Sequence, residues 1–418
     1  MQKHIFIITG EASGDEHAAK LIRELNSQPG VPPLKISGIG GDAMIEAGCE
    51  VIYPLAKYGV TGLTEIVQQW KHIRSAFRLG QNFISQNQID LLILVDYPGF
   101  NLRFAKWAKS QGIKILYYIS PQIWAWKAKR IHKIKQRVDM MAVILPFEKE
   151  IYAKHQIPCR FVGHPLTDQL QLSAPKADLI KRFGLSEAKR QIALLPGSRR
   201  NEIKQLLPYM ATLAQSLDRK YPDQLQFVLP VASSLTPDIL EPYIAGLSVD
   251  LKIITTASTP DILSCSQLAI VASGTASLQA ALLAIPSIII YRASRLTYVV
   301  ATQVIQCAYL GLANLIAGKM IQPELVQDDL NDKNLLLQAD NLLNNRTVVQ
   351  NIVRDLKKTS KMLENISIDC RLAQLVFQML SITKTSIKDT SKRSRNPQFE
   401  VKKTSDSIAT PVESQSVT

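Results

Sequence analysis

The stretch IFIITGEASGDEH, residues 5–17, decides the fold class. Its first part, Ile5–Thr9, is an apolar run of strand length, and a glycine-containing turn carries the chain from it into a helix. A strand without polar alternation is typical of a parallel sheet that is covered on both faces. The stretch therefore predicts a strand–turn–helix unit at the start of an α/β fold.

The same pattern repeats along the chain, because short apolar runs alternate with helical patterns. Strands and helices that alternate at this spacing indicate doubly wound α/β domains. The further strands that we predict are Leu91–Val95, Ile115–Ile119, Met141–Leu145, Arg160–Gly163, Ile192–Leu195, Gln226–Leu229, Leu268–Ala272 and Ser287–Tyr291.

With 418 residues the chain is longer than one ordinary domain. Prolines and polar residues at 163–176 predict a domain boundary in that segment. We expect one α/β domain at residues 1–166, a second at 167–345, helices at 346–382 that pack back on the domains, and a disordered tail rich in Ser, Thr and Lys at 383–418.

The chain is basic, with 49 Lys and Arg against 35 Asp and Glu, and this net charge of +14 predicts an anionic partner. Nucleic acid, phospholipid headgroups and phosphorylated small molecules all fit. The five cysteines form no C-x-x-C pair, which indicates reduced thiols in a cytoplasmic protein, and we see no signal peptide. Turn residues and polar side chains interrupt the charge-free stretches 268–291 and 296–318, so we expect no membrane span there.

Ligands bind parallel sheets beyond the carboxyl ends of the strands, so the residues after each strand form the candidate site. Asp96 follows a strand and can act as general base for an attacking hydroxyl, or cap the next helix. Glu11 is the other candidate base. The G-x-x-x-G spacing at residues 10–14 is not a dinucleotide fingerprint, which argues against NAD. The residues that we expect to contact the acceptor or a sugar include Ser13, Gly14, Asp15 and Asn101.

Two later turns, each between a strand and a helix, predict a nucleotide-sugar site. Helix-end N–H groups beside the guanidinium of Arg199, with Arg200 next to it, suit a pyrophosphate. An ordinary capped helix with exposed arginines is the alternative. The residues of this predicted site are Gly197, Ser198, Arg199, Ser273, Gly274, Thr275, Ala276, Ser277 and Gln279.

The sequence predicts no metal and no cofactor. No two aspartates stand two positions apart, so the D-x-D pair that many nucleotide-sugar transferases use for Mg²⁺ or Mn²⁺ is missing, and the six histidines are scattered. The charge of a departing pyrophosphate would then be offset by Arg199, with help from Arg200, and by helix N-termini.

A basic, aromatic surface is expected in the first domain. Residues 101–138 contain ten Lys and Arg and no Asp or Glu, and the four tryptophans lie in or just before this region. Such a surface suits an anionic bilayer, but also single-stranded nucleic acid or a solvated basic face over core tryptophans. We predict a membrane surface and no nucleic acid as partner. The predicted patch consists of Trp70, Arg74, Phe77, Arg78, Trp124 and Trp126.

Eight motifs occur in a fixed order, and through them the sequence closely resembles the lipid A disaccharide synthase family. Each motif is weak alone, but eight in the family's order are strongly specific. They are GEASGD at 10–15, DYPGFN at 96–101, YISPQIWAWK at 118–127, LPFE at 145–148, FVGHP at 161–165, LLPGSR at 194–199, SGTASLQAALL at 273–283 and NLIAGKMIQPELVQ at 314–327.

The resemblance implies a glycosyltransferase-B architecture, in which two Rossmann-like domains face a cleft. It implies an inverting transfer of 2,3-diacylglucosamine from its UDP donor to the 6-hydroxyl of 2,3-diacylglucosamine 1-phosphate, in lipid A (lipopolysaccharide) biosynthesis. Asp96 and Arg199 would be the residues most tied to activity, and Asn314 a further acceptor or sugar contact. The protein would lie on the cytoplasmic face of the inner membrane of a Gram-negative-type cell, and a homodimer stays open.

Three positions depart from the family's pattern. Gln279 replaces the usual Glu, which removes a carboxylate from the expected ribose contact. Gly99 stands where some relatives have an acidic residue, and Ala313 where proline is frequent. Two other functions stay open: another UDP-sugar enzyme with two Rossmann-like domains, such as a 2-epimerase, and a catalytically reduced homologue that binds membranes or nucleic acid.

Overall fold

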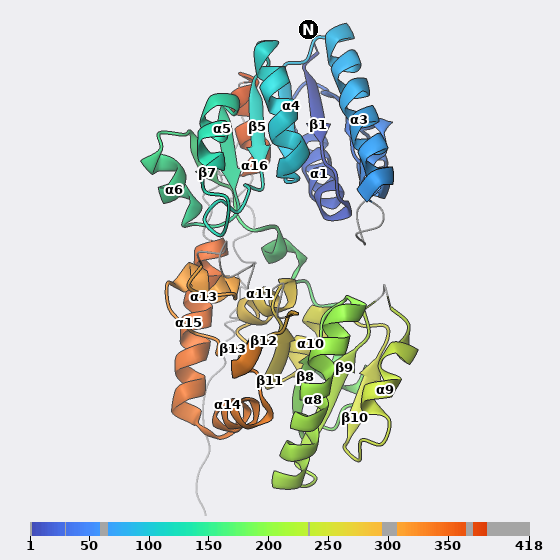
Figure 1. Cartoon of the computed structure of the whole chain (residues 1–418), viewed down its shortest axis with the longest axis vertical. Helices are drawn as coiled ribbons and strands as arrows, with labels where there is room; N and C mark the ends of the chain where they lie inside the picture. Colours follow the sequence, from blue (N-terminus) through green and yellow to red (C-terminus); the bar gives the residue numbers. More distant parts are fainter. Residues whose placement is uncertain are drawn as a thin grey trace, which may run out of the picture.

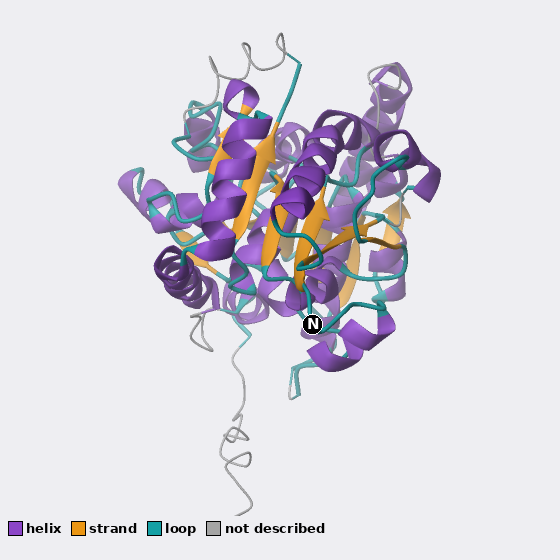
Figure 2. Ribbon diagram, turned by 90° about the horizontal axis from the view of Figure 1, so that it is seen from below, coloured by secondary structure: helices purple, strands orange, loops and turns teal. Residues whose placement is uncertain are grey.

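The computed structural model describes residues 2–29, 31–58, 66–232, 235–294, 307–364 and 371–382. Within these ranges, seven strands form one parallel sheet and six form a second (Figure 1). Helices lie on both faces of the strands (Figure 2). This confirms the predicted α/β class with two Rossmann-like, doubly wound sheets.

The first sheet has the strand order β3-β2-β1-β4-β5-β6-β7. One face packs on α1, α2 and the C-terminal α16, and the other on α3, α4, α5 and α6. The strands are β1 (His4–Ile8), β2 (Lys35–Ile39), β3 (Glu50–Tyr53), β4 (Leu91–Val95), β5 (Ile115–Tyr118), β6 (Met140–Val143) and β7 (Cys159–Phe161). The helices are α1 (Ala12–Asn26), α2 (Asp42–Glu46), α3 (Ile66–Gln86), α4 (Pro98–Ser110), α5 (Arg130–Arg137), α6 (Glu148–Lys154) and α16 (Leu372–Met379).

The second sheet has the order β10-β9-β8-β11-β12-β13. Its larger core lies under α8, α13, α14 and α15, and its smaller core under α7 and α10. The strands are β8 (Arg190–Leu195), β9 (Leu225–Pro230), β10 (Leu251–Ile254), β11 (Leu268–Ala272), β12 (Ser287–Tyr291) and β13 (Glu324–Val326). The helices are α7 (Lys176–Arg182), α8 (Arg200–Lys220), α9 (Glu241–Ile244), α10 (Thr259–Cys265), α11 (Thr275–Leu282), α13 (Leu312–Ala317), α14 (Asp332–Asn344) and α15 (Arg346–Glu364).

Strand side chains alternate between the cores on the two faces of each sheet. In β1, Ile5 and Ile7 belong to the core under α1, whereas Phe6 and Ile8 belong to the core under α4. A slip of one residue would exchange these faces, so the register is fixed. The register pairs Ile8 with Leu94 of β4, and therefore brings the segments that follow β1 and β4 to one edge.

Each strand predicted from the sequence coincides with an observed strand to within two residues at either end. The prediction missed β2, β3, β10 and β13. Three of these are only partly buried, so they lack the continuous apolar run that identifies a central strand. The fourth, β2, ends within the glycine-rich Ser37–Gly41 segment. Gly38 is required there, because a Cβ would lie 2.3 Å from the carbonyl oxygen of Ile7 on β1.

The chain crosses between its two halves more than once. It leaves the first sheet after β7, and an ion pair between Lys20 of α1 and Asp168 holds the connecting segment. After the second sheet, α15 packs against α11, α13 and α14, while α16 packs against α1 of the first half. The predicted tail at 383–418 and part of the charge-free stretch 296–318 lie outside the described residues. No described helix is both long and apolar enough to cross a membrane.

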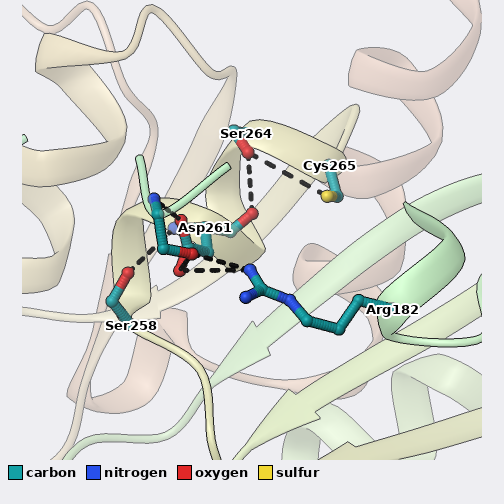
Figure 3. Close-up of polar contacts among 6 residues, drawn as sticks. Arg182, Ser258, Asp261, Ser264 and Cys265 are labelled. Carbon is teal, nitrogen blue, oxygen red and sulfur yellow. Dashed lines mark hydrogen bonds and ion pairs between the residues drawn. The ribbon is translucent and has the colours of Figure 1, made fainter. Parts of the chain in front are cut away.

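Asp261, in the first turn of α10, anchors the connecting segment to the second half (Figure 3). Its buried carboxylate accepts hydrogen bonds from the backbone N–H and the hydroxyl of Ser173, at 2.9 and 2.8 Å. Arg182 donates to the same hydroxyl at 2.6 Å and lies 4.0 Å from the carboxylate. Burial alone would raise the pKa of Asp261, but the hydrogen bonds from Ser173 and the nearby guanidinium hold this pKa below its ordinary value.

Replacing Asp261 with alanine removes the buried carboxylate that accepts both hydrogen bonds from the exposed Ser173, and we expect the free energy of unfolding to fall by about 1–3 kcal/mol because hydrogen bonds to a charged group are lost. The folded-state pKa of Asp261 is lowered, so its stabilisation is present above the unfolded pKa of ~3.9 and is lost as the pH falls below it. Urea unfolding at neutral and acidic pH measures both effects. The exposed Asp238→Ala is the matched control. Equal losses in the two variants would contradict the anchoring role.

Candidate active site

Asp96 follows β4 at the point where the strand order of the first sheet reverses direction. Asp96 and Tyr97 both have positive φ, 46° and 45°, a conformation that is strained for residues other than glycine. Hydrogen bonds hold the Asp96 backbone: its N–H donates to Tyr118 O at 2.9 Å, and its carbonyl accepts from Asn101 Nδ2 at 2.7 Å and Tyr117 Oη at 2.6 Å. The N-cap of α4 is Tyr97. The position of Asp96 is thus set through its backbone.

The carboxyl of Asp96 has an altered acidity. Burial, and then the negative charge of Glu11, raise the pKa of Asp96 to about 6, although the Tyr97 N–H opposes this shift. A carboxylate with a pKa close to neutrality is a stronger base than an ordinary aspartate and still largely ionised at pH 7. Glu11 is exposed at the N-terminus of α1, and its side chain does not cap the helix. The two acidic groups predicted as candidate bases therefore interact electrostatically.

The two glycines of the GEASGD turn have internal packing partners. The ring of Tyr97 lies against Gly10, where a Cβ would come within 2.3 Å of the ring. At Gly14 a Cβ would lie 2.2 Å from Thr9 Oγ1. Both glycines therefore allow close packing around the end of β1.

Of the predicted acceptor contacts in the first half, three have structural roles. Gly14 packs as described, and the buried Asp15 accepts hydrogen bonds from Gly41 N–H at 2.7 Å and Ala43 N–H at 2.9 Å, which caps α2. The fully buried Asn101 supports the backbone of Asp96. Ser13 is exposed on the first turn of α1. Direct contact of these residues with an acceptor stays a prediction, and Ser13 is the one best placed for it.

In the second half, Glu202 occupies the turn that we predicted to hold pyrophosphate. Glu202 Oε2 accepts hydrogen bonds from the N–H groups of Ser198 and Arg199, at 3.0 and 3.2 Å, and Oε1 lies 3.2 Å from Arg199 Nη1. Gly197, with φ of +109°, is required because a Cβ would lie 2.2 Å from this carboxylate. The backbone donors are therefore satisfied internally, whereas the side chain of Arg199 is 82% exposed.

The second predicted turn, Ser273–Ser277, lies beside the first because β11 pairs with β8, with Leu195 opposite Val271. This is the point where the strand order of the second sheet reverses. Gly274 and Thr275 are exposed, and Ser273, Ala276 and Gln279 are half-buried. Ser277 is buried and its hydroxyl donates to Gly274 O at 2.7 Å, so it closes the turn.

Asn314 is fully buried and organises the segment that leads to β13. Its Oδ1 accepts from the N–H groups of Ile321 and Gln322, and its Nδ2 donates to Gln322 O at 2.8 Å and to Glu324 Oε1 at 2.6 Å. Its role as an acceptor or sugar contact stays a prediction, and these bonds give it a structural role.

The predicted membrane patch divides into separate parts. Trp70, with 57% of its surface exposed, lies on α3, as do Arg74, Phe77 and Arg78. Trp126 is also exposed, with the cations of Lys127 and Arg130 over its ring.

Trp124 lies elsewhere and is partly buried against the core of the second half. Its ring contacts Phe147 at a centroid distance of 5.3 Å, and its Nε1 donates to Glu148 at 3.3 Å. Burial raises the pKa of this Glu148 to about 7. Trp124 therefore has a packing role that the sequence-based patch did not include.

The sequence prediction missed Tyr117 and Glu202. Tyr117 was hidden in an apolar strand, and its contact with the Asp96 carbonyl is long-range in sequence. Glu202 could have been identified from the sequence, since it stands three residues after the N-cap Arg199, as in a capping box.

In the described part of the chain, no group of three His, Cys, Asp or Glu side chains is arranged to hold a metal ion.

The chain matches a family model described as Lipid-A-disaccharide synthetase over residues 5–379. It is 44% identical to Lipid-A-disaccharide synthase 1 of Legionella pneumophila (strain Lens) over 377 residues, which are 90% of this chain and 97% of that protein. It is 41% identical to Lipid-A-disaccharide synthase of Nitrosococcus oceani over 342 residues, which are 82% and 87% of the two chains.

Solved structures with a similar fold include UDP-GlcNAc 2-epimerase from Neisseria meningitidis, with a TM-score of 0.56 and 12% identity over 92% of this chain and 100% of that chain. They also include Acinetobacter baumannii MurG, with a TM-score of 0.54 and 12% identity over 91% and 100%. At such low identity these structures show the fold alone. The family model and the relatives cover most of the sequence, and the chain therefore belongs to the lipid-A-disaccharide synthetase family.

Proposed function

We propose that this glycosyltransferase of lipid A biosynthesis transfers 2,3-diacylglucosamine from UDP to the 6-hydroxyl of 2,3-diacylglucosamine 1-phosphate. The products would be a β-linked disaccharide 1-phosphate and UDP. The family match over residues 5–379 supports the reaction. The observation that carries the residue assignment is the carboxyl of Asp96, whose pKa is raised to about 6 at the switch point of the first sheet.

In the proposed reaction Asp96 takes the proton of the acceptor's 6-hydroxyl. The oxygen attacks the anomeric carbon of the donor, a C–O bond forms, and the bond from that carbon to the UDP oxygen breaks with the electron pair leaving on UDP. The attack from the opposite side inverts the anomeric centre. The backbone bonds to Asn101 and Tyr117 hold Asp96 in place, which favours a productive geometry. Glu11 is proposed to tune Asp96 and remains the second candidate base.

On the donor side we propose that Arg199 neutralises the charge that develops on the departing diphosphate. Its guanidinium is exposed at the N-terminus of α8, where the helix dipole also favours an anion. The Ser198 and Arg199 N–H groups would join it only after the Glu202 carboxylate swings away, because Glu202 now accepts both hydrogen bonds. No step in this proposal uses a metal ion.

A 2-epimerase function is the competing proposal, since epimerases share the fold. That likeness is at 12% identity, whereas the synthase relatives reach 44%. We therefore favour the transferase. We also propose that the protein works at the cytoplasmic surface of a membrane, to which the α3 part of the patch would dock through Trp70 and its neighbouring arginines.

The pH dependence of kcat/KM tests the base. Activity should rise with pH through about 6, because Asp96 must lose its proton to act. Since the charge of Glu11 raises this pKa, Glu11→Gln should move the acidic limb to lower pH. Glu16→Gln, which removes an exposed charge from the same helix, is the control and should leave the limb in place. Asp96→Asn should lower turnover by on the order of 10²–10⁴. An identical limb in both glutamine variants would refute the electrostatic link.

Arg199→Ala should reduce kcat/KM for the UDP donor by on the order of 10²–10³, because an uncompensated charge would develop on the leaving group. The KM for the acceptor should stay unchanged. Steady-state kinetics with each substrate varied in turn measures this. Lys204→Ala, an exposed cation one turn further along α8, is the control. A loss confined to the acceptor's KM would place Arg199 in the wrong half of the site.

A further inference from the structure

A groove of about 610 Å³ runs between α3 and α4. The aromatic side chains that form its floor include Trp70, Phe77, Tyr97 and Phe100. The Phe77 and Phe100 rings pack edge to face at 5.5 Å, and the Tyr97 and Phe100 rings stack at 6.1 Å. This volume lies in the range of binding sites for small organic ligands. The groove is therefore large enough for an apolar chain, and the packed aromatic rings form its apolar floor.

Arginines surround this apolar floor. Arg74, Arg78 and Arg103 line the groove and are exposed, and no acidic side chain among the described residues lines it. In the described part of the chain none of these guanidiniums forms an ion pair with a carboxylate. An apolar floor inside a ring of uncompensated cations matches a ligand that joins a hydrocarbon chain to an anion.

One end of the groove is formed by the turn that carries the candidate base. Tyr97 and Gly99, which both line it, stand one and three residues after Asp96. The Tyr97 ring is fixed against Gly10, so one end of the groove is held at the carboxyl edge of the first sheet. A ligand at this end of the groove would therefore contact the turn that carries the proposed base.

We propose that this groove binds one acyl chain of the acceptor, and that the arginines around it bind the acceptor's 1-phosphate. The inference rests on the proposed function. It assigns the groove to the acceptor because Asp96 acts on the acceptor's hydroxyl, while the donor's diphosphate is assigned to Arg199 on the second sheet. If these residues only docked the protein on a membrane, a flat surface would be enough, and it would not need to lie next to the turn that carries the base.

Gly99 offers a way to close the groove. A Cβ at this position meets no atom within 4 Å, and the residue is exposed in the first turn of α4. Gly99→Leu therefore adds an apolar side chain at the base end of the groove without displacing the backbone.

The test compares acceptors with no acyl chains, short chains and longer chains, all dissolved as monomers, with the UDP donor saturating. For the wild type, the acceptor's KM should fall by up to roughly fourfold for each methylene that enters the groove. Gly99→Leu should abolish this dependence, raise the KM for the longest acceptor at least tenfold, and leave the KM values for the donor and the chain-free acceptor unchanged. A thermal melt checks that the variant is folded.

The arginines are tested with the same acceptors with and without the 1-phosphate. Arg103→Met should raise the KM only for the phosphorylated acceptor. Lys106→Met, an exposed cation on the same helix outside the groove, should change neither.

Three results would overturn the proposal. If the acceptor's KM still depended on acyl-chain length in Gly99→Leu, the groove would not be the binding site of the acyl chain. A raised KM for the donor would assign the groove to the donor. If Gly99→Leu bound vesicles more weakly but had unchanged kinetics on monomeric acceptors, the groove would serve only to dock the protein on a membrane. Failure of the proposed function looks different, because wild-type protein would then form no disaccharide from any acceptor.

Discussion

The site depends on one constraint, the parallel register between strands at the two points where the strand order reverses. Ile8 of β1 pairs with Leu94 of β4, and Leu195 of β8 pairs with Val271 of β11. Because these strands are buried on both faces, their register cannot shift without exposing core residues to the wrong side. Turns that are more than 75 residues apart in sequence are thereby brought to the same edge. The proposed base lies at this edge of the first sheet, and the proposed leaving-group residue lies at the corresponding edge of the second.

Around this frame, buried polar groups hold strained or charged segments in place. Hydrogen bonds from Asn101 and Tyr117 stabilise the left-handed backbone of Asp96 and Tyr97. Burial of the Asp96 carboxyl, and then the charge of Glu11, raise the pKa of Asp96. In the second half, Glu202 accepts hydrogen bonds from the N–H groups of Ser198 and Arg199. In the proposed reaction, the Asp96 end of the site is already in place, whereas the Glu202 side chain has to move before a diphosphate can bind these N–H groups.

The strands and turns that follow from local sequence patterns could be predicted, whereas the side-chain contacts between residues far apart in sequence could not. β4, β11 and β12 were predicted to the residue because each is an uninterrupted apolar run. Turns after β1, β4, β8 and β11 were identified for the same reason. The structural role of Asp15 could not be predicted, because its partner Gly41 is 26 residues away in sequence. Trp124 was assigned to a surface by composition, whereas its packing against the core of the second half depends on how the halves meet.

We propose that the protein joins an acylated donor to an acylated acceptor with inversion. The most direct test of this reaction is NMR analysis of the products that the purified full chain forms from UDP-2,3-diacylglucosamine and 2,3-diacylglucosamine 1-phosphate. We expect a disaccharide 1-phosphate with a β linkage to the 6-oxygen of the acceptor, together with an equal amount of UDP. Release of UDP without a disaccharide, or a donor epimerised at the 2-position, would contradict it.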